Sequence, residues 1–187
     1  MFDVDAGDRT EPEQRFRTLY LGHYRQVYMY FRRRTDIERA RDGTAETFLV
    51  AWRRLDDVPG GDRTLPWLYG TARRVLANQW RSRRRSDHLQ ERLGGIAARA
   101  DPGPEARVVP SAEAQSVRDA MGRLRKTDRE VIRLAEWEGL SHGEIAVALG
   151  CTVHAVDQRM FRARRRLAGE LGVGVPAVAR PAEGGAS

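Results

Sequence analysis

The sequence contains very little cysteine, histidine or lysine. Cys151 is its only cysteine, which excludes a disulfide framework and a thiolate metal site within one chain. The four histidines have no metal-ligand spacing with one another or with Cys151, so we expect no metal and no cofactor. Of 33 basic residues only Lys126 is lysine. Arginine suits bidentate recognition of phosphate and guanine, although a GC-rich genome produces the same bias.

Long apolar runs are also missing. None approaches the length of a membrane span, and the N-terminus is acidic where a signal peptide would be basic and then apolar. We therefore expect a cytoplasmic protein with no membrane insertion. The 187 residues carry a formal charge of +7 and a pI of about 10.4, which favours a polyanion as the partner.

No alternating pattern typical of β-strands has a useful length, and apolar residues recur at helical spacing, so the predicted fold is all-α. Two small helical domains are expected, over residues 12–85 and 117–171. Residues 86–116 contain glycine and proline pairs and five acids against three arginines, a composition typical of a flexible linker. Residues 172–187 are rich in glycine, proline and alanine and are predicted to form a disordered tail.

The C-terminal domain has the pattern of a helix-turn-helix over residues 140–167. Ser141 and Glu144 have the spacing of a capping box at the start of the first helix. Gly150 supplies the positive φ that ends this helix, and Thr152 begins the second. The apolar positions expected on the second helix are Val153, Val156, Met160 and Leu167.

Polar side chains on the second helix face away from this apolar stripe. A polar face on a second helix, placed by a tight turn against a first, is what enters the major groove of DNA. The same pattern also describes an ordinary helical hairpin with solvated arginines. DNA contact is favoured because the arginines from Arg159 to Arg166 have no acid among them, which is costly in self-repulsion unless a polyanion neutralises the charge.

Aromatic residues and arginines meet in the third helix expected in the first domain, residues 66–80, and in the arginine run that follows it. Trp67, Tyr69 and Trp80 lie among these arginines, and unpaired bases stack on aromatic faces. The competing interpretation places the tryptophans in the core. We interpret Trp67 and Phe48 as core residues. The residues interpreted as DNA-binding are Arg74, Asn78 and Arg81.

Three strings in the chain, in their order and spacing, resemble a bacterial RNA polymerase sigma factor of the extracytoplasmic-function (ECF) group of the sigma-70 family. They are Ala45–Leu55, Pro66–Arg74 and Gly139–Arg164. The resemblance covers most of the chain. It implies that residues 12–85 are the promoter-melting and polymerase-binding domain, sigma region 2, and that residues 117–171 are the minus-35 binding domain, sigma region 4.

The resemblance implies a factor that binds core RNA polymerase, recognises minus-35 and minus-10 promoter elements and stabilises strand opening, without being an enzyme. Promoter DNA and core RNA polymerase are the implied partners, and an anti-sigma factor is usual for the group. The residues implied for the minus-10 strand are Arg73, Arg74, Asn78, Arg81 and Arg84. Those implied for the minus-35 element are Thr152, His154, Ala155, Asp157, Gln158, Arg159 and Arg162. Those implied for polymerase docking are Asp42, Glu46, Thr47 and Phe48.

The chain departs from the family pattern at three positions. Gly43 stands inside the docking helix, where glycine costs about 1 kcal/mol relative to alanine, so weaker polymerase binding or a helix that orders on binding is expected. Arg74 stands where the group often has asparagine, which affects the expected base preference at the minus-10 element. Asp157 stands where lysine or arginine is common; an acid there repels phosphate but can accept a hydrogen bond from cytosine N4.

Two other functions compete with this one. A dimeric helix-turn-helix regulator that binds duplex operators without polymerase explains residues 117–171 equally well. It leaves the aromatic and arginine-rich block before residue 86 without a role. A nucleic-acid-processing enzyme would need metal-ligand spacing or paired carboxylates in a pocket motif, and the sequence has neither.

Overall fold

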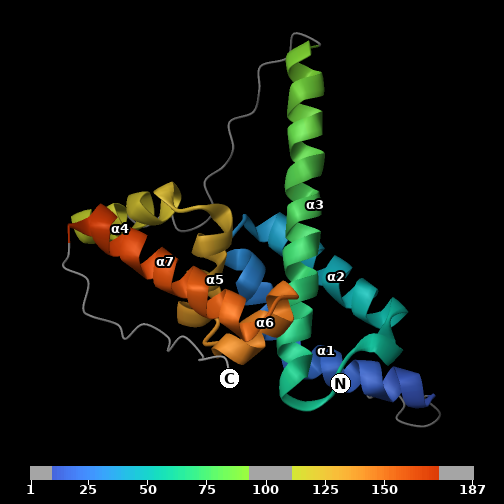
Figure 1. The fold of residues 1–187 in the computed structure, drawn as a ribbon. Helices are drawn as coiled ribbons and strands as arrows, with labels where there is room; N and C mark the ends of the chain where they lie inside the picture. Colours follow the sequence, from blue (N-terminus) through green and yellow to red (C-terminus); the bar gives the residue numbers. More distant parts are fainter. Residues whose placement is uncertain (1–9, 93–110, 173–187) are drawn as a thin grey trace, which may run out of the picture. The chain divides into compact units, whose positions relative to one another are not determined.

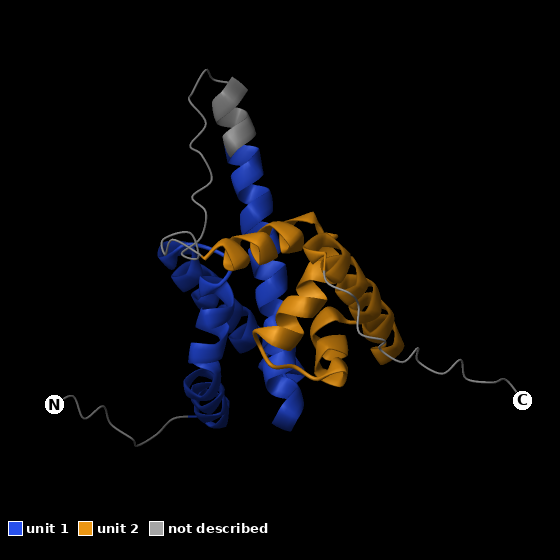
Figure 2. Ribbon diagram, turned by 90° about the vertical axis from the view of Figure 1, so that its left-hand side faces the viewer, with its two compact units in different colours: residues 1–105 blue, residues 106–187 orange. Residues whose placement is uncertain are grey.

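The computed structural model describes residues 10–92 and 111–172, which form α-helices and two short 3-10 helices (Figure 1). The described ranges contain no β-strand, which confirms the predicted all-α class. The chain divides into two compact units, residues 1–105 and 106–187, and each is described by itself (Figure 2).

The helix bounds shorten the predicted linker at both ends. Helix α3, Thr64–Arg92, continues past residue 85, and helix α4, Ala112–Arg123, begins before residue 117. Residues 93–110 of the predicted linker and residues 173–187 of the predicted tail lie outside the described residues. The helical parts of the two domains are therefore longer than their apolar patterns indicated.

Unit 1 is built from three helices, α1 (Glu11–Arg32), α2 (Ile37–Arg53) and α3, each of which packs against the other two. Asp36 begins α2 by accepting a hydrogen bond from the Arg39 amide. The side chains buried between the three helices are apolar and aromatic, and two of the rings, Tyr30 and Tyr69, lie 5.5 Å apart between centroids. The core also contains Leu19, Val27, Phe31, Phe48, Leu68, Val75 and Leu76.

Gly43 lies where α2 crosses the ring of Phe31 on α1. A Cβ atom at residue 43 would stand 2.7 Å from Cδ1 and 2.8 Å from Cζ of that ring. The ring is completely buried and meets Tyr30 edge-on, so it has little room to move aside. Helix α2 is continuous through Gly43 without any partner chain. The glycine that departs from the family pattern therefore makes room for the Phe31 ring in the core of unit 1.

Two 3-10 turns, η1 (Leu55–Asp57) and η2 (Gly61–Arg63), connect α2 to α3. The connection is held to the helical core at both ends. Arg15 of α1 donates to the Val58 carbonyl over 3.0 Å, and the Thr64 hydroxyl donates to the Pro59 carbonyl over 2.7 Å. Val58 itself is buried. The segment between these anchors has a fixed path and exposes its charged side chains.

Unit 2 contains α4 and three further helices, α5 (Lys126–Glu136), α6 (His142–Leu149) and α7 (Val153–Leu171). Helix α7 packs against the other three. The predicted helix-turn-helix is confirmed as α6 and α7. The capping box of Ser141 and Glu144 is present, and Gly150 ends α6 in the left-handed conformation with φ of 62°. Of the apolar positions predicted on α7, Val156 and Met160 are buried, while Val153 is exposed.

A buried acid joins α5 to α7. Asp128, in the first turn of α5, is only 3% exposed, and its Oδ2 accepts a hydrogen bond from Arg166 Nη1 at 3.0 Å. A second pair of the same kind, Arg164 with Glu136, joins these helices at the surface over 3.4 Å. The two pairs differ in burial, so they are expected to differ in their effect on stability.

The Gly43 contact predicts an unusual response to alanine. Gly43→Ala should lower the free energy of unfolding by about 1–3 kcal/mol, because the added methyl overlaps the Phe31 ring. Gly22→Ala in α1 is the control: nothing lies within 4 Å of its Cβ position, so alanine should stabilise the chain by about 0.5–1 kcal/mol. Urea unfolding of both variants measures the difference. Stabilisation of equal size in the two would show that the ring yields without cost.

The Asp128 pair predicts a second contrast. Arg166→Ala leaves a buried carboxylate without its guanidinium and should cost about 1–3 kcal/mol. Arg164→Ala removes an arginine of the same helix whose partner, Glu136, is well exposed. It should lower the free energy of unfolding by under about 1 kcal/mol. Chemical unfolding of the full chain compares them. A loss for Arg164→Ala as large as that for Arg166→Ala would mean that burial of Asp128 is unimportant.

Candidate nucleic-acid interface

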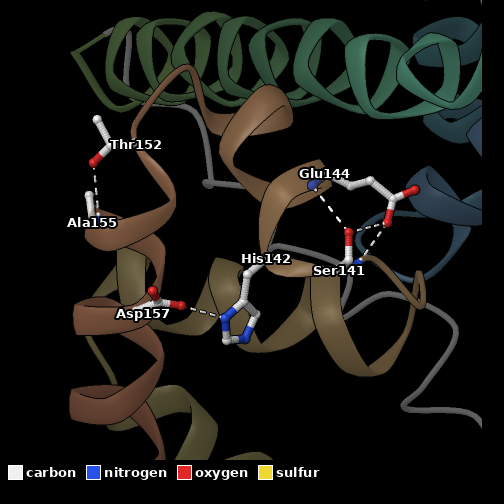
Figure 3. A network of polar contacts seen from close by, with 6 residues as sticks. All are labelled: Ser141, His142, Glu144, Thr152, Ala155 and Asp157. Carbon is white, nitrogen blue, oxygen red and sulfur yellow. Dashed lines mark hydrogen bonds and ion pairs between the residues drawn. The ribbon is translucent and has the colours of Figure 1, made fainter. Parts of the chain in front are cut away.

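The exposed face of α7 is set by a cap and a buried stripe. Thr152 begins the helix, and its Oγ1 accepts a hydrogen bond from the Ala155 amide at 3.2 Å (Figure 3). Val156, Met160 and Ala163 are buried on the inner side. The predicted minus-35 residues divide into two groups. Those that are exposed are Thr152, His154 and Arg162, and those that are half-buried are Ala155, Asp157, Gln158 and Arg159.

The arginines of α7 do not form one free cluster. Arg164 and Arg166 are paired with acids of α5, and Arg159 donates to Cys151 Sγ at 3.4 Å. No acid stands within the run itself, as the sequence shows, but two of its arginines are neutralised by acids of α5. Within the described residues the structure gives Arg162 and Arg165 no hydrogen bond or ion pair, and both are exposed. These two arginines are left to meet an outside anion.

Arg165 was missing from the predicted site. It follows Arg162 by three residues and Gln158 by seven, so the three side chains share one face of α7. The signal was present in the helical spacing. From the sequence alone Arg165 could not be distinguished from the other arginines of the run, because the acids that pair with some of those arginines lie on α5.

Asp157 does not extend freely toward solvent. Its Oδ1 accepts a hydrogen bond from His142 Nδ1 at 2.5 Å, and His142 is the first residue of α6 (Figure 3). At the same end of α6, Glu144 accepts from the Ser141 amide at 2.8 Å and from its hydroxyl at 2.6 Å. These hydrogen bonds lower the pKa of Glu144, against a smaller effect of burial. The start of α6 therefore carries the Glu144 carboxylate, held by Ser141, and the His142 imidazole, which is hydrogen-bonded to α7.

The predicted minus-10 residues all lie on the exposed side of α3. Arg74, Asn78 and Arg81 recur at helical spacing and form one stripe, and Arg73 and Arg84 form a neighbouring stripe. Arg74 Nε donates to the Gly70 carbonyl at 3.1 Å, and Arg81 hydrogen-bonds the Asn78 side chain. The stripe is therefore partly organised before any ligand binds.

Of the three aromatic residues assigned to this helix, only Trp80 has the exposure that base stacking needs. It is 44% exposed and shares the stripe of Arg73 and Arg84. Tyr69 is buried against Tyr30, so its predicted place beside a DNA strand is wrong. Trp67 is half-buried, so its exposure does not decide between a core residue and a ring available for base stacking.

The predicted docking residues lie on two different sides of α2, one exposed and one buried. Asp42 and Glu46 are exposed. Thr47 and Phe48 are buried, which confirms the interpretation of Phe48 as a core residue and leaves neither side chain at the surface of α2. Thr47 Oγ1 donates to the Gly43 carbonyl at 2.7 Å, so it serves its own helix. The Phe48 ring packs against rings of α1: Phe16, Tyr20 and Tyr24.

Leu49 is an exposed apolar residue on the same side of α2 as Asp42 and Glu46, and it was not among the predicted docking residues. Leu49 is 45% exposed and follows Asp42 by seven residues and Glu46 by three. Two acids and a leucine therefore lie on one accessible surface.

Two chemical features are not found among the described residues. No three histidine, cysteine or acidic side chains of residues 10–92 and 111–172 gather closely enough to bind a metal ion. In those same ranges, no helix combines the length and apolar character that crossing a bilayer requires.

Two family profiles match the chain. The sigma-70 region 2 profile matches residues 19–86, and the sigma-70 region 4 profile matches residues 114–167. The first match covers the helices of unit 1, with the α2 and α3 surfaces just described. The second covers most of the described part of unit 2, including the helix-turn-helix.

Curated relatives match this chain along most of its length and most of their own. The RNA polymerase sigma factor NccH of Alcaligenes xylosoxydans is 35% identical over 133 residues, which are 67% of this chain and 69% of that protein. The RNA polymerase sigma factor CnrH of Cupriavidus metallidurans is 35% identical, over 73% of this chain and 74% of its own. The ECF RNA polymerase sigma-E factor of Haemophilus influenzae is 30% identical, over 70% and 73%.

Solved structures of similar proteins match the helical architecture. The sigma factor RpoE in complex with the anti-sigma factor NepR from Bartonella quintana aligns with a TM-score of 0.60 and 25% identity, covering 84% of this chain and 97% of that chain. CnrH in complex with the cytosolic domain of CnrY aligns with a TM-score of 0.59 and 25% identity, covering 89% and 91%. With both regions matched and relatives 35% identical along more than two thirds of their length, this chain belongs to the extracytoplasmic-function group of the sigma-70 family of RNA polymerase sigma factors.

Proposed function

We propose that this sigma factor divides promoter recognition between its two units. Unit 1 binds core RNA polymerase through the exposed face of α2 and holds the unpaired minus-10 strand on α3. Unit 2 reads the minus-35 duplex through α7. The observation that carries the proposal is the α7 face on which exposed Arg162 and Arg165 lie beside half-buried Gln158, and both arginines lack a partner within the described residues. In a helix-turn-helix this face enters the major groove, where arginine binds guanine or phosphate.

The α3 surface suits a single strand better than a duplex. Single-stranded DNA is bound by a positively charged track with aromatic faces on which bases stack. Arg73 and Arg84 flank exposed Trp80 on one stripe, and Arg74 and Arg81 lie on the next. A displaced base can stack on the Trp80 ring while the arginines on either side bind its phosphates. Arg74 is expected to contact the backbone rather than to select a base.

The α2 face offers a mixed surface for core polymerase. Asp42 and Glu46 supply negative charge, and Leu49, three residues after Glu46, supplies apolar area. Charge gives orientation and encounter rate, while a desolvated apolar side chain contributes affinity. Thr47 and Phe48 support this surface from beneath and make no contact themselves.

The chain is proposed to act without catalytic chemistry of its own. RNA synthesis belongs to the polymerase, and the factor works where polymerase and chromosome meet, in the cytoplasm. An anti-sigma factor is a further proposed partner, because the similar sigma factor RpoE is in complex with the anti-sigma factor NepR. The dimeric operator-binding regulator is not favoured, since it assigns no role to the region 2 match over residues 19–86.

Polymerase docking is tested by two neighbouring substitutions in α2. Glu46→Ala should leave thermal unfolding unchanged and weaken binding to core RNA polymerase, with loss of run-off transcription from a promoter library. Phe48→Ala should instead lower stability by about 3 kcal/mol or more, because a buried ring is removed. Glu113→Ala on α4 is the charge-matched control. Unchanged core affinity in Glu46→Ala would remove this face from the interface.

Strand binding is tested on α3. Alanine variants of Arg74, Asn78 and Arg81 should form polymerase complexes on a premelted template and fail to open closed duplex, because the contacts to the unpaired strand are lost. Permanganate reactivity of unpaired thymines reports opening, and Arg17→Ala on α1 is the matched exposed arginine. If all three variants open duplex normally, the strand contacts lie on another surface.

A further inference from the structure

We propose that His142 binds a DNA backbone phosphate through Nε2, that it takes up a proton when it does so, and that Asp157 positions it. The inference rests on the proposed reading of the minus-35 duplex by unit 2. It assigns a function to Asp157, an acid in the first half of the basic helix α7, and to a residue of α6 outside the predicted site.

The two side chains form a joined pair across the helix-turn-helix. His142 opens α6 and Asp157 lies in the second turn of α7, and Nδ1 stands 2.5 Å from Oδ1. The pair is at the surface, with the imidazole 41% and the carboxylate 34% exposed. The other ring nitrogen, Nε2, lies on the side of the ring turned away from Asp157 (Figure 3).

The hydrogen bond determines what Nε2 can offer. An ionised carboxylate only accepts, so the proton between the two residues belongs to Nδ1 of His142. A neutral imidazole has one N–H, and here Nδ1 holds it. Nε2 then presents a lone pair, which cannot bind a phosphate oxygen. While Nδ1 keeps its proton for Asp157, only the imidazolium form donates from Nε2, so phosphate binding by the neutral ring requires one further proton, which comes from solvent.

The neighbouring charges favour that extra proton once DNA is present. The imidazolium would lie between the Asp157 carboxylate on one side and a phosphate on the other, and each anion stabilises the cation. Asp157 is the charged group that faces His142 from α7. From α5 the structure gives His142 no hydrogen bond or ion pair. Of the three acids of that helix, Asp128 and Glu136 are paired with arginines of α7, and Glu130 also has an interaction of its own.

The place of His142 in the motif suits a backbone contact. In a helix-turn-helix the second helix lies in the groove and the first crosses the phosphate backbone beside it. His142 is the first residue of that first helix, and its partner lies on the helix that enters the groove. An unpaired Asp157 would repel the backbone, whereas the protonated pair has no net charge and offers an N–H donor. Asp157, which departs from the family pattern, thus contributes to a DNA contact by positioning His142.

The test measures the affinity of holoenzyme, full chain with core RNA polymerase, for a promoter duplex between pH 6.0 and 8.5 at several salt concentrations. In the wild type, affinity should fall with rising pH by up to about tenfold per unit in the range where the imidazolium is lost. His142→Gln should remove this part of the pH dependence and reduce the salt slope at low pH by about 0.9. His23→Gln, on α1, is the histidine control and should behave as the wild type.

Asp157→Asn separates positioning from simple packing. Asparagine can still accept a hydrogen bond from Nδ1 but carries no charge. The rise in promoter affinity on acidification should therefore occur at lower pH than in the wild type. A pair that only fastens α6 to α7 would respond differently: His142→Gln would then weaken binding equally at every pH, with an unchanged salt slope, and the proposal would be overturned.

Arg162→Ala distinguishes failure of this inference from failure of the proposed function. If Arg162→Ala weakens promoter binding while His142→Gln has the pH profile of the wild type, only the histidine contact is refuted. If neither substitution changes affinity or salt slope, unit 2 does not face DNA, and both proposals fail.

Discussion

The surface proposed to read DNA depends on how α7 is fixed along its inner side. Val156, Met160 and Ala163 are buried there, and the Asp128 carboxylate holds Arg166 at the end of the same helix. An arginine-rich helix has no strong reason to stay against its own domain, because like charges repel and water solvates them well. The apolar stripe supplies the attraction, and the buried acid limits rotation of the helix about that stripe.

Local signals made the helix-turn-helix predictable from the sequence. The capping box of Ser141 and Glu144 and the left-handed Gly150 involve residues within a few positions of one another, so their geometry follows from spacing alone. The partners of Gly43 and Asp157 were not predictable in this way. Phe31 and His142 reach them from other helices, and a single sequence does not say which helix faces which.

Helical phase was the other source of error. A stripe of apolar residues predicts that a helix is amphipathic, but its edge residues are ambiguous within about 40° of rotation. Phe48 and Leu49 are adjacent in sequence, and one is buried while the other is exposed. Tyr69 fell inside the core for the same reason. Functional residues lie next to core residues on such helices, so site assignment from strings alone mixes the two.

The contact between Gly43 and Phe31 also fixes the axial register of α1 and α2. A ring seated over a missing side chain acts as a knob in a hole, and neither helix can slide by a fraction of a turn without driving the ring into a neighbouring side chain. Asp42 is the residue next to this hole. The position of the acidic surface along α2 is therefore set by a buried contact on another side of the helix, between Gly43 and Phe31.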